Sequence, residues 1–179
     1  MKNVKNKPTS LDVIHFRQLR KKDFQRVREI ALKGWLWSYN YLPAEELTEL
    51  VNKYYSDKSL EKSFENIKSK KDFFIVAEKN NEIIGFIHAG MKTKDTGELH
   101  RFYLDTKFIW KGIGKLLLQK AEKFLKKKGC KKYFTFVNKH GKRAPEFYIR
   151  NGFQRIPKKD QHDEFRQYGK VLWYIEKKL

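Results

Sequence analysis

Residues 98–129 read ELHRFYLDTKFIWKGIGKLLLQKAEKFLKKKG, and this stretch decides the fold. Its first part is apolar and aromatic and predicts a strand, whereas its last part predicts a helix with one buried face. The apolar positions of that face are 113, 116, 117, 121, 124 and 125. Gly112 and Gly114 lie in the turn between the two elements. A strand that enters a helix through glycines directs several backbone N–H groups at one point, which favours an anion, above all a phosphate.

The composition indicates a single globular domain with a strongly basic surface. The chain has 179 residues, of which 40% are hydrophobic, enough to bury a sizeable core. Its formal net charge of +20 favours polyanionic partners such as a phosphorylated cofactor, nucleic acid or acidic lipid headgroups. The one cysteine, Cys130, excludes an internal disulfide. No apolar run approaches the roughly 18 residues of a membrane helix, and no apolar leader is present, so we expect a cytoplasmic protein without a membrane partner.

The order of elements along the chain predicts a mixed α/β sheet in one domain. Residues 1–10 are polar and basic and are expected to form a flexible tail, so that the domain spans 11–179. A strand comes first, followed by a helix with Asp23 as its N-cap. The apolar stripe of this helix is Phe24, Val27, Ile30 and Ala31. Helical segments follow Pro43, and then come a hairpin, the stretch 98–129, a strand, a short helix and a last strand.

Two motifs in the second half of the chain carry a family resemblance. Tyr103-Leu104 precede the turn Lys111-Gly112-Ile113-Gly114-Lys115, and residues 144–153 read APEFYIRNGF. These resemble the Arg/Gln-x-x-Gly-x-Gly/Ala and Ala-x-x-Phe-Tyr-x-x-x-Gly-Phe motifs of the GNAT superfamily of acetyl-CoA-dependent N-acetyltransferases. The resemblance covers about residues 11–179, with specific motifs in the second half only. It implies a central, mostly antiparallel sheet that is splayed at the strand before the glycine turn, with helices on both faces.

The resemblance also implies that the glycine turn holds the pyrophosphate of acetyl-CoA through backbone N–H groups. The implied cofactor-binding residues are Tyr103, Leu104, Trp110, Lys111, Gly112, Ile113, Gly114, Lys115, Asn138 and Tyr148. Two positions depart from the family pattern: Ile109 replaces the usual Arg or Gln, and Gly141 replaces a frequent Asn. Either Asn138 takes the place of that Asn, or the loop KHGKR, residues 139–143, is rearranged. Backbone donors need no particular side chain, so binding is expected to survive the first departure. The alternative is a packing turn that binds nothing.

Catalytic roles are implied for Tyr148, for Leu104 and for a base. Tyr148 would protonate the leaving thiolate, because the pKa of a phenol, about 10, keeps it protonated at neutral pH; the alternative is a core tyrosine. The backbone N–H of Leu104 would bond the thioester carbonyl. Glu98 and then His100 are the candidate bases, on one strand face and in phase with Phe102 and Leu104. Their alternatives are an ion pair with a lysine for Glu98 and a half-buried structural histidine for His100.

The aromatic stretch WLWSYNY, residues 35–41, is expected to wall an acceptor pocket, because aromatic faces attract ammonium groups. Trp35, Trp37 and Tyr41 are the predicted substrate residues, with core packing as the alternative. This stretch and RFYLDTKF (101–108) are most similar to polyamine acetyltransferases of the Pai type. That similarity implies direct acetyl transfer to a primary amine such as spermidine. The net charge of +20 opposes a polycation unless the following carboxylates Glu45, Glu46 and Glu49 form a local negative mouth.

Other functions remain open at the level of sequence. These are acetylation of a peptide α-amine, binding of nucleic acid on the same fold, and binding of acetyl-CoA by a regulatory domain without turnover. Nucleic acid is disfavoured because the basic residues are spread along the chain without a recognised motif. Cys130 follows a predicted helix C-terminus, where the dipole opposes a thiolate nucleophile. No metal site is predicted, and the sequence does not fix the oligomeric state, a homodimer included.

Overall fold

A computed structural model describes residues 13–109, 111–141, 143–161 and 171–179. The predicted tail, residues 1–10, lies outside these ranges. The elements, in chain order, are β1 (His15–Gln18), α1 (Phe24–Ser38), α2 (Ala44–Tyr54), α3 (Asp57–Lys68), β2 (Asp72–Lys79), β3 (Glu82–Met91), β4 (Thr96–Leu104), α4 (Ile113–Lys127), β5 (Lys132–Asn138), α5 (Arg143–Arg150), β6 (Gln154–Arg155) and β7 (Leu172–Lys178). This order confirms the predicted mixed α/β fold. Among the described residues, no helix is both long enough and apolar enough to span a membrane.

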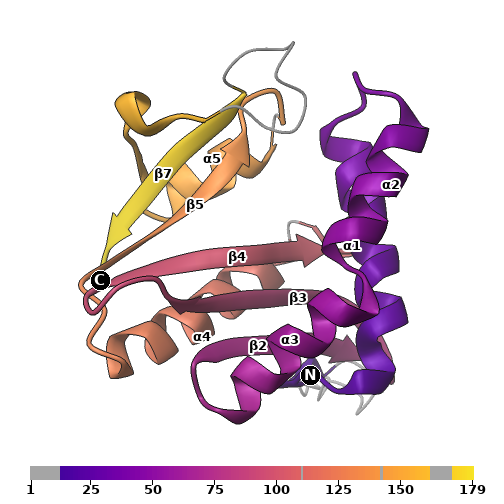
Figure 1. The fold of residues 1–179 in the computed structure, drawn as a ribbon, viewed down its shortest axis with the longest axis horizontal. Coiled ribbons are helices and arrows are strands. Elements are labelled where there is room, and N and C mark those ends of the chain that lie inside the picture. Colours follow the sequence, from indigo (N-terminus) through magenta and orange to yellow (C-terminus); the bar gives the residue numbers. More distant parts are fainter. Residues whose placement is uncertain (1–12, 110, 142, 162–170) are drawn as a thin grey trace, which may run out of the picture.

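The sheet has seven strands in the order β1-β2-β3-β4-β5-β7-β6, and its neighbours are antiparallel except for β4 and β5. The parallel pair is short: only residues 96–98 of β4 pair with residues 132–134 of β5. Beyond these residues the two strands diverge, and Figure 1 shows them as the two arms of a V. The splay expected before the glycine turn is therefore confirmed.

Helices cover both faces of this sheet, as predicted, and each face has its own core. On one face, Leu117, Ala121 and Leu125 of α4 pack against β2, β3 and β4. On the other face, α1 and α3 bury Val27, Ile30 and other apolar side chains against Phe74 and Phe86 of the sheet. The apolar stripes that define these helices in the sequence are thus the stripes that they bury.

The first helix is longer than expected, and its predicted cap works differently. α1 runs to Ser38, so Trp35 and Trp37 belong to its last turns rather than to a segment between helices. The Asp23 side chain does not cap α1. It accepts a hydrogen bond of 2.7 Å from the backbone N–H of Arg20 and pairs with Arg17 at 2.7 Å. The buried carboxylate therefore stabilises the segment that connects β1 to α1, and it does not cap the first turn of the helix.

A bulge in β4 overturns one expectation about side-chain direction. Leu99 pairs with Ala89, but His88 pairs with Arg101, so His100 is an extra residue in β4. Because side chains alternate along a strand, one extra residue reverses the phase after it. Phe102 and Leu104 pack on the α4 face, while Glu98 and His100 line a cavity on the opposite face. The prediction that all four side chains share one face was wrong.

Candidate active site

A groove of about 330 Å³ lies between the N-terminal end of α4 and α5, beside the point where β4 and β5 diverge. It is lined by Trp37, Phe102, Leu104, Ile109, Gly112, Gly114, Lys115, Arg143, Ala144, Phe147 and Tyr148. The structure thus brings together five of the residues predicted to bind the cofactor, from β4, the glycine turn and α5. Ile109, the departure from the family pattern, also lines this groove. Trp110 lies outside the described residues.

The glycine turn leaves the start of α4 open to an anion. Gly112 has a φ of +78°, a left-handed conformation that suits glycine, and a β-carbon there would meet nothing within 4 Å. No side chain caps α4, and its first turn contains no acidic residue. The N–H groups of residues 113–115 therefore have no acceptor within the helix, because its first hydrogen bond runs from Leu116 to Gly112. Ile113 can contribute only its backbone, since its side chain is buried in the core.

The two lysines beside the turn occupy different positions. The Lys115 side chain lines the groove. The ammonium group of Lys111 lies 5.2 Å from the centre of the Phe108 ring. Both are near the open N–H groups, so the turn combines backbone donors with positive charge, as an anion site requires.

Two backbone amides of β4 face the gap left by β5. The N–H of Asp105 donates to Ile84 of β3, at 2.8 Å. Since successive N–H groups in a strand point to alternate sides, those of Leu104 and Phe102 point away from β3, toward the side where β5 has diverged. The Leu104 amide was predicted to bind a carbonyl oxygen. The Phe102 amide was not predicted, because the register of β4 is not visible in the sequence.

Tyr148 lies at the inner wall of the groove. Its side chain is buried and packs edge-to-face against Phe102, Phe147 and Phe153. Burial raises the pKa of Tyr148 well above its usual value, with a further contribution from Tyr103. The hydroxyl is therefore protonated at neutral pH, which is the state that an acid requires.

A second and larger cavity, of about 870 Å³, lies on the opposite face of β4. Its walls come from α1, α2, α3 and the sheet, and include Trp35, Tyr39, Tyr54, Tyr55, Asn66, Asp72, His88, Glu98, His100, Arg101, Tyr103 and Phe136. Tyr103 was predicted as a cofactor residue, yet its side chain lies in this second cavity. The ring packs against α1 at Gly34, where a β-carbon would lie only 2.5 Å from Tyr103 Cδ1.

The three aromatic residues predicted for the substrate occupy three different places. Trp35 lines the larger cavity and stacks on Tyr39, with ring centres 5.4 Å apart. Trp37 lines the groove instead, with the Arg143 guanidinium 4.9 Å from its ring. Tyr41 lines neither described cavity, and its hydroxyl lies 3.4 Å from Asn138 Oδ1. The separation of Trp35 from Trp37 follows from α1, which turns neighbouring side chains to different sides, whereas Tyr41 lies beyond the end of this helix.

Asn138, a predicted cofactor residue, uses its side chain to join α1 to the end of β5. Its Nδ2 donates to the carbonyl of Ser38 at 3.0 Å, and its Oδ1 accepts from the N–H of His140 at 3.0 Å. The amide is buried and does not line the groove. The carboxylates Glu45, Glu46 and Glu49 are exposed on α2 and line neither cavity, so the predicted negative mouth does not include them.

Glu98 contacts two basic side chains of this chain. Its Oε2 lies 3.1 Å from Lys92 Nζ, and its Oε1 lies 3.4 Å from His100 Nδ1. The hydrogen bond with His100, together with Lys92, lowers the pKa of Glu98 to about 2. Such a carboxylate is ionised but a poor proton acceptor. It also lies about 17 Å from Leu104, because their partners on β3, Gly90 and Gly85, are five residues apart. Any proton transfer between the two places therefore needs intervening water.

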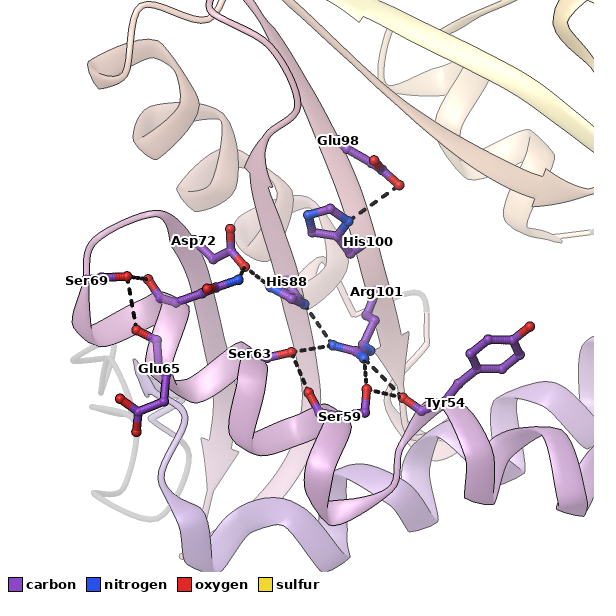
Figure 2. Close-up of polar contacts among 11 residues, drawn as sticks. Tyr54, Ser59, Ser63, Glu65, Ser69, Asp72, His88, Glu98, His100 and Arg101 are labelled. Atoms are coloured by element: carbon purple, nitrogen blue, oxygen red, sulfur yellow. Dashed lines mark hydrogen bonds and ion pairs between the residues drawn. The ribbon is translucent and has the colours of Figure 1, made fainter.

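The larger cavity contains a polar network that the sequence did not reveal. Figure 2 shows Asp72, His88 and Arg101 in a row, from three neighbouring strands. Arg101 donates to His88 Nδ1 at 3.0 Å, and because a guanidinium has no acceptor, the imidazole proton must sit on Nε2 and point to Asp72 Oδ2, also at 3.0 Å. Burial lowers the pKa of His88 to about 4, so the ring is neutral at pH 7. No local spacing signals this network, which depends on strand register.

Arg101 also fastens the junction of α2 and α3 to the sheet. Its guanidinium donates to Ser63 Oγ at 2.9 Å, to Ser59 Oγ at 3.0 Å and to the carbonyl of Tyr54 at 3.1 Å. The same group lies 5.1 Å from the centre of the Tyr55 ring. These contacts shape one wall of the larger cavity and hold His88 in one orientation.

Asp72, His88 and His100 place one ligand atom each within 4.8 Å of one another, which raises the question of a metal ion. A metal at His88 Nε2 would force the ring proton onto Nδ1, which faces the Arg101 guanidinium. Both nitrogens of His88 are already engaged, so this cluster is not preformed for a metal.

Comparisons with known proteins agree with this geometry. A family model described as the acetyltransferase (GNAT) family matches residues 30–153. Spermidine N(1)-acetyltransferase of Thermoplasma acidophilum is 32% identical over 143 residues, which cover 79% of this chain and 88% of that protein. The crystal structure of PaiA N-acetyltransferase from Thermoplasma acidophilum in complex with coenzyme A superposes with a TM-score of 0.82 at 28% identity, covering 93% of this chain and 99% of the other.

A GNAT-family acetyltransferase from Staphylococcus aureus has the same fold, with a TM-score of 0.73 at 18% identity, covering 93% of this chain and 99% of the other. The open helix start, the splayed strands and the matched residues 30–153 lead to one assignment. The chain belongs to the acetyltransferase (GNAT) family.

Proposed function

We propose that this acetyl-CoA-dependent N-acetyltransferase acetylates a primary amine of a polyamine, with spermidine as the first acceptor to test. The observation that carries the proposal is the pair of cavities on opposite faces of β4, the strand that diverges from β5. The groove suits the cofactor, and the larger cavity suits a cationic acceptor. The similarity to a spermidine N(1)-acetyltransferase over 79% of the chain supports the choice of acceptor.

The residues of the groove fit the cofactor. The open N–H groups of residues 113–115 suit a pyrophosphate, and an acidic side chain that would repel it is absent from the first turn of α4. Apolar side chains of Phe102, Leu104 and Phe147 suit the slender arm that leads to the sulfur. Bound acetyl-CoA supplies an activated thioester. The amides of Phe102 and Leu104, which point away from β3, would donate to its carbonyl oxygen, and the Tyr148 hydroxyl would give up a proton to the leaving thiolate.

The larger cavity contains two carboxylates and several aromatic rings on a protein with a net charge of +20, and Arg101 and Lys62 also line it. Asp72 and Glu98 supply carboxylates, and Trp35, Tyr39 and Tyr54 supply ring faces. A distant basic surface is screened by salt, whereas groups in contact with a bound amine are not. Attraction within the cavity can thus exceed repulsion by the rest of the molecule.

Release of coenzyme A should be measured with spermidine, propylamine and a peptide with a free α-amine, between pH 7 and pH 9. The rate with spermidine should rise with pH, because an amine with a pKa of about 10.4 is almost fully charged at neutral pH. A flat baseline with spermidine across this range, with turnover of the peptide, would replace the polyamine by a peptide acceptor.

Binding of acetyl-CoA should be measured separately by calorimetry. In Gly114→Trp the new side chain would fill the groove, since a β-carbon at Gly114 already lies 3.3 Å from Phe147 and 3.4 Å from Phe102. Binding should be lost in this variant. Undiminished binding would place the cofactor outside the groove.

A further inference from the structure

We propose that Asp72 binds the distal ammonium group of the polyamine acceptor, the end that is not acetylated. The proposal rests on the function proposed above and identifies the residue that would distinguish polyamines from monoamines. It starts from the carboxylate of Asp72, which is the first residue of β2 and lines the larger cavity.

Asp72 is an ionised carboxylate without a cationic partner among the described residues. Its Oδ2 accepts hydrogen bonds from His88 Nε2 at 3.0 Å and from Asn66 Nδ2 at 2.9 Å. Both donors are neutral at pH 7. These bonds lower the pKa of Asp72 although burial opposes them, and the side chain is only 12% exposed. A half-buried negative charge of this kind gains most from a cation that arrives with the ligand.

The larger cavity gives a cation access to Asp72 and His100 together, since both residues line it. The Asp72 carboxylate lies over Gly90: a β-carbon at Gly90 would lie 2.3 Å from Asp72 Oδ1 and 3.2 Å from His100 Nε2, so these two polar atoms lie close to each other on the cavity wall. An ammonium group there could donate to Asp72 Oδ1. It could also donate to His100 Nε2, because Glu98 beside Nδ1 favours the tautomer that leaves Nε2 as an acceptor.

The site is too far from the acetyl-transfer point to hold the reacting amine. Asp72 pairs with Gly90, which pairs with Glu98, so these residues form one row across β2, β3 and β4. The amides of Phe102 and Leu104 lie opposite Ile87 and Gly85, which are three and five residues from Gly90 along β3, about 10 and 17 Å at the rise of a strand. A cation beside Asp72 therefore belongs to the other end of a long acceptor.

The other charged residues that line the cavity are Glu98, Arg101 and Lys62, and of the two carboxylates Asp72 is the better suited to this role. Glu98 already has Lys92 at 3.1 Å, so a second cation would have to compete for it. Arg101 lies on the far side of the neutral His88 ring from Asp72, where four of its hydrogen bonds fix it (Figure 2). A cation at Asp72 is separated from the guanidinium by the width of an imidazole.

The test compares Asp72→Asn with the wild type on spermidine and on propylamine at saturating acetyl-CoA. Asparagine keeps the shape and an acceptor for His88 but removes the charge. We expect kcat/KM for spermidine to fall by about 10- to 100-fold, as for a partly buried ion pair that loses its charge, and kcat/KM for propylamine to change by less than about 3-fold. Glu65→Gln is the matched control: it removes one charge from the exposed side of nearby α3 and should alter neither value.

An equal fall in kcat/KM for spermidine and propylamine in Asp72→Asn would overturn the proposal and make Asp72 a structural residue. An unchanged ratio of the two kcat/KM values, without any fall, would also overturn it. Calorimetry of spermidine with the coenzyme A complex separates this result from failure of the proposed function. Spermidine binding that weakens about 10-fold in Asp72→Asn, without any turnover in the wild type, would keep the Asp72 site and reject acetylation. Wild-type protein that binds no spermidine would reject the site. Asp72→Glu, which keeps the charge, should retain part of the preference for spermidine.

Discussion

Tyr103 and Leu104 are adjacent in β4, yet their side chains line different cavities: Tyr103 lines the larger cavity, and Leu104 lines the groove beside α4. One strand thus forms the wall between both halves of the proposed reaction. Each side chain of β4 faces only one of the two cavities. Of this strand, only the backbone amides lie between the cavities. This arrangement makes the two cavities separable by mutation, and the predictions below use that.

Gly112→Ala should weaken acetyl-CoA binding by about 10-fold or more, because a β-carbon at a φ of +78° costs about 1 kcal/mol and shifts the N–H groups of the turn. Gly129→Ala is a matched control at the other end of α4. Gly129 has a φ of +80° and equally open surroundings, so it should cost similar stability without changing the dissociation constant. Calorimetry and thermal unfolding of both variants check this, and equal affinities would argue against the turn as the cofactor site.

Tyr148→Phe should lower kcat by about 100-fold while changing KM for acetyl-CoA by less than about 3-fold, since it removes a proton donor and keeps the ring packing. Tyr133→Phe is its control. Tyr133 is also buried, but it does not line the groove, and its hydroxyl donates to Glu122 at 2.6 Å. That variant should lose about 1 kcal/mol of stability and keep its kcat. A full kcat in Tyr148→Phe would assign Tyr148 to the core alone.

Stability should fall with acid between about pH 6.5 and pH 4 because of His88. Its pKa is lowered to about 4 in the folded protein, so the unfolded chain binds a proton in this range that the folded protein does not. The contribution of His88 is thus present above pH 6.5 and lost as the pH falls, by about 3 kcal/mol in total. The lowered pKa of Glu98 acts in a lower range, between about 4.5 and 2.

Urea unfolding at several pH values measures this slope. His88→Gln can still donate to Asp72 and accept from Arg101, but it does not titrate, so the slope between pH 6.5 and pH 4 should flatten. His15→Gln, which changes an exposed imidazole on β1, should keep the slope. The same slope in His88→Gln would mean that another group titrates.

Replacing Trp35 and replacing Trp37, two residues apart on α1, should change KM for different substrates. Trp37→Ala removes a groove residue that lies under Arg143 and should raise KM for acetyl-CoA by about 3- to 10-fold with little effect on the amine. Trp35→Phe alters the wall of the larger cavity and should raise KM for the amine instead. Initial-rate kinetics with each substrate varied in turn tests both. Identical patterns in the two variants would contradict the assignment of the cavities.

The sequence predicted those parts of the fold and site that depend on local spacing. The glycine turn, the stripe of α4 and the Phe-Tyr pair of α5 are short-range patterns, and the structure brings Gly112, Gly114 and Tyr148 to one groove. It did not predict the bulge at His100, because an extra residue is defined only against the partner strand β3. The faces of Glu98 and Phe102 were consequently misjudged.

The larger cavity illustrates the same limit. Asp72, His88 and Arg101 are far apart in the sequence and meet only through the register of β2, β3 and β4. Likewise, Trp37 reached the groove because α1 continues through the aromatic stretch, where the sequence suggested that a helix had ended.

The divergence of β4 from β5 has a mechanical meaning. Strands β1 to β4 and strands β5 to β7 form two parts of the sheet that are paired only through residues 96–98 and 132–134. The hydrogen bond between Asn138 and Ser38 also joins the end of β5 to α1. A molecule that binds between β4 and β5 and accepts hydrogen bonds from β4 would take the place of β5 as the neighbour of that strand. Binding of the cofactor between β4 and β5 should then slow the exchange of the Phe102 and Leu104 amide protons with solvent. The region between the two strands should become more rigid when the cofactor binds and more flexible when the product leaves.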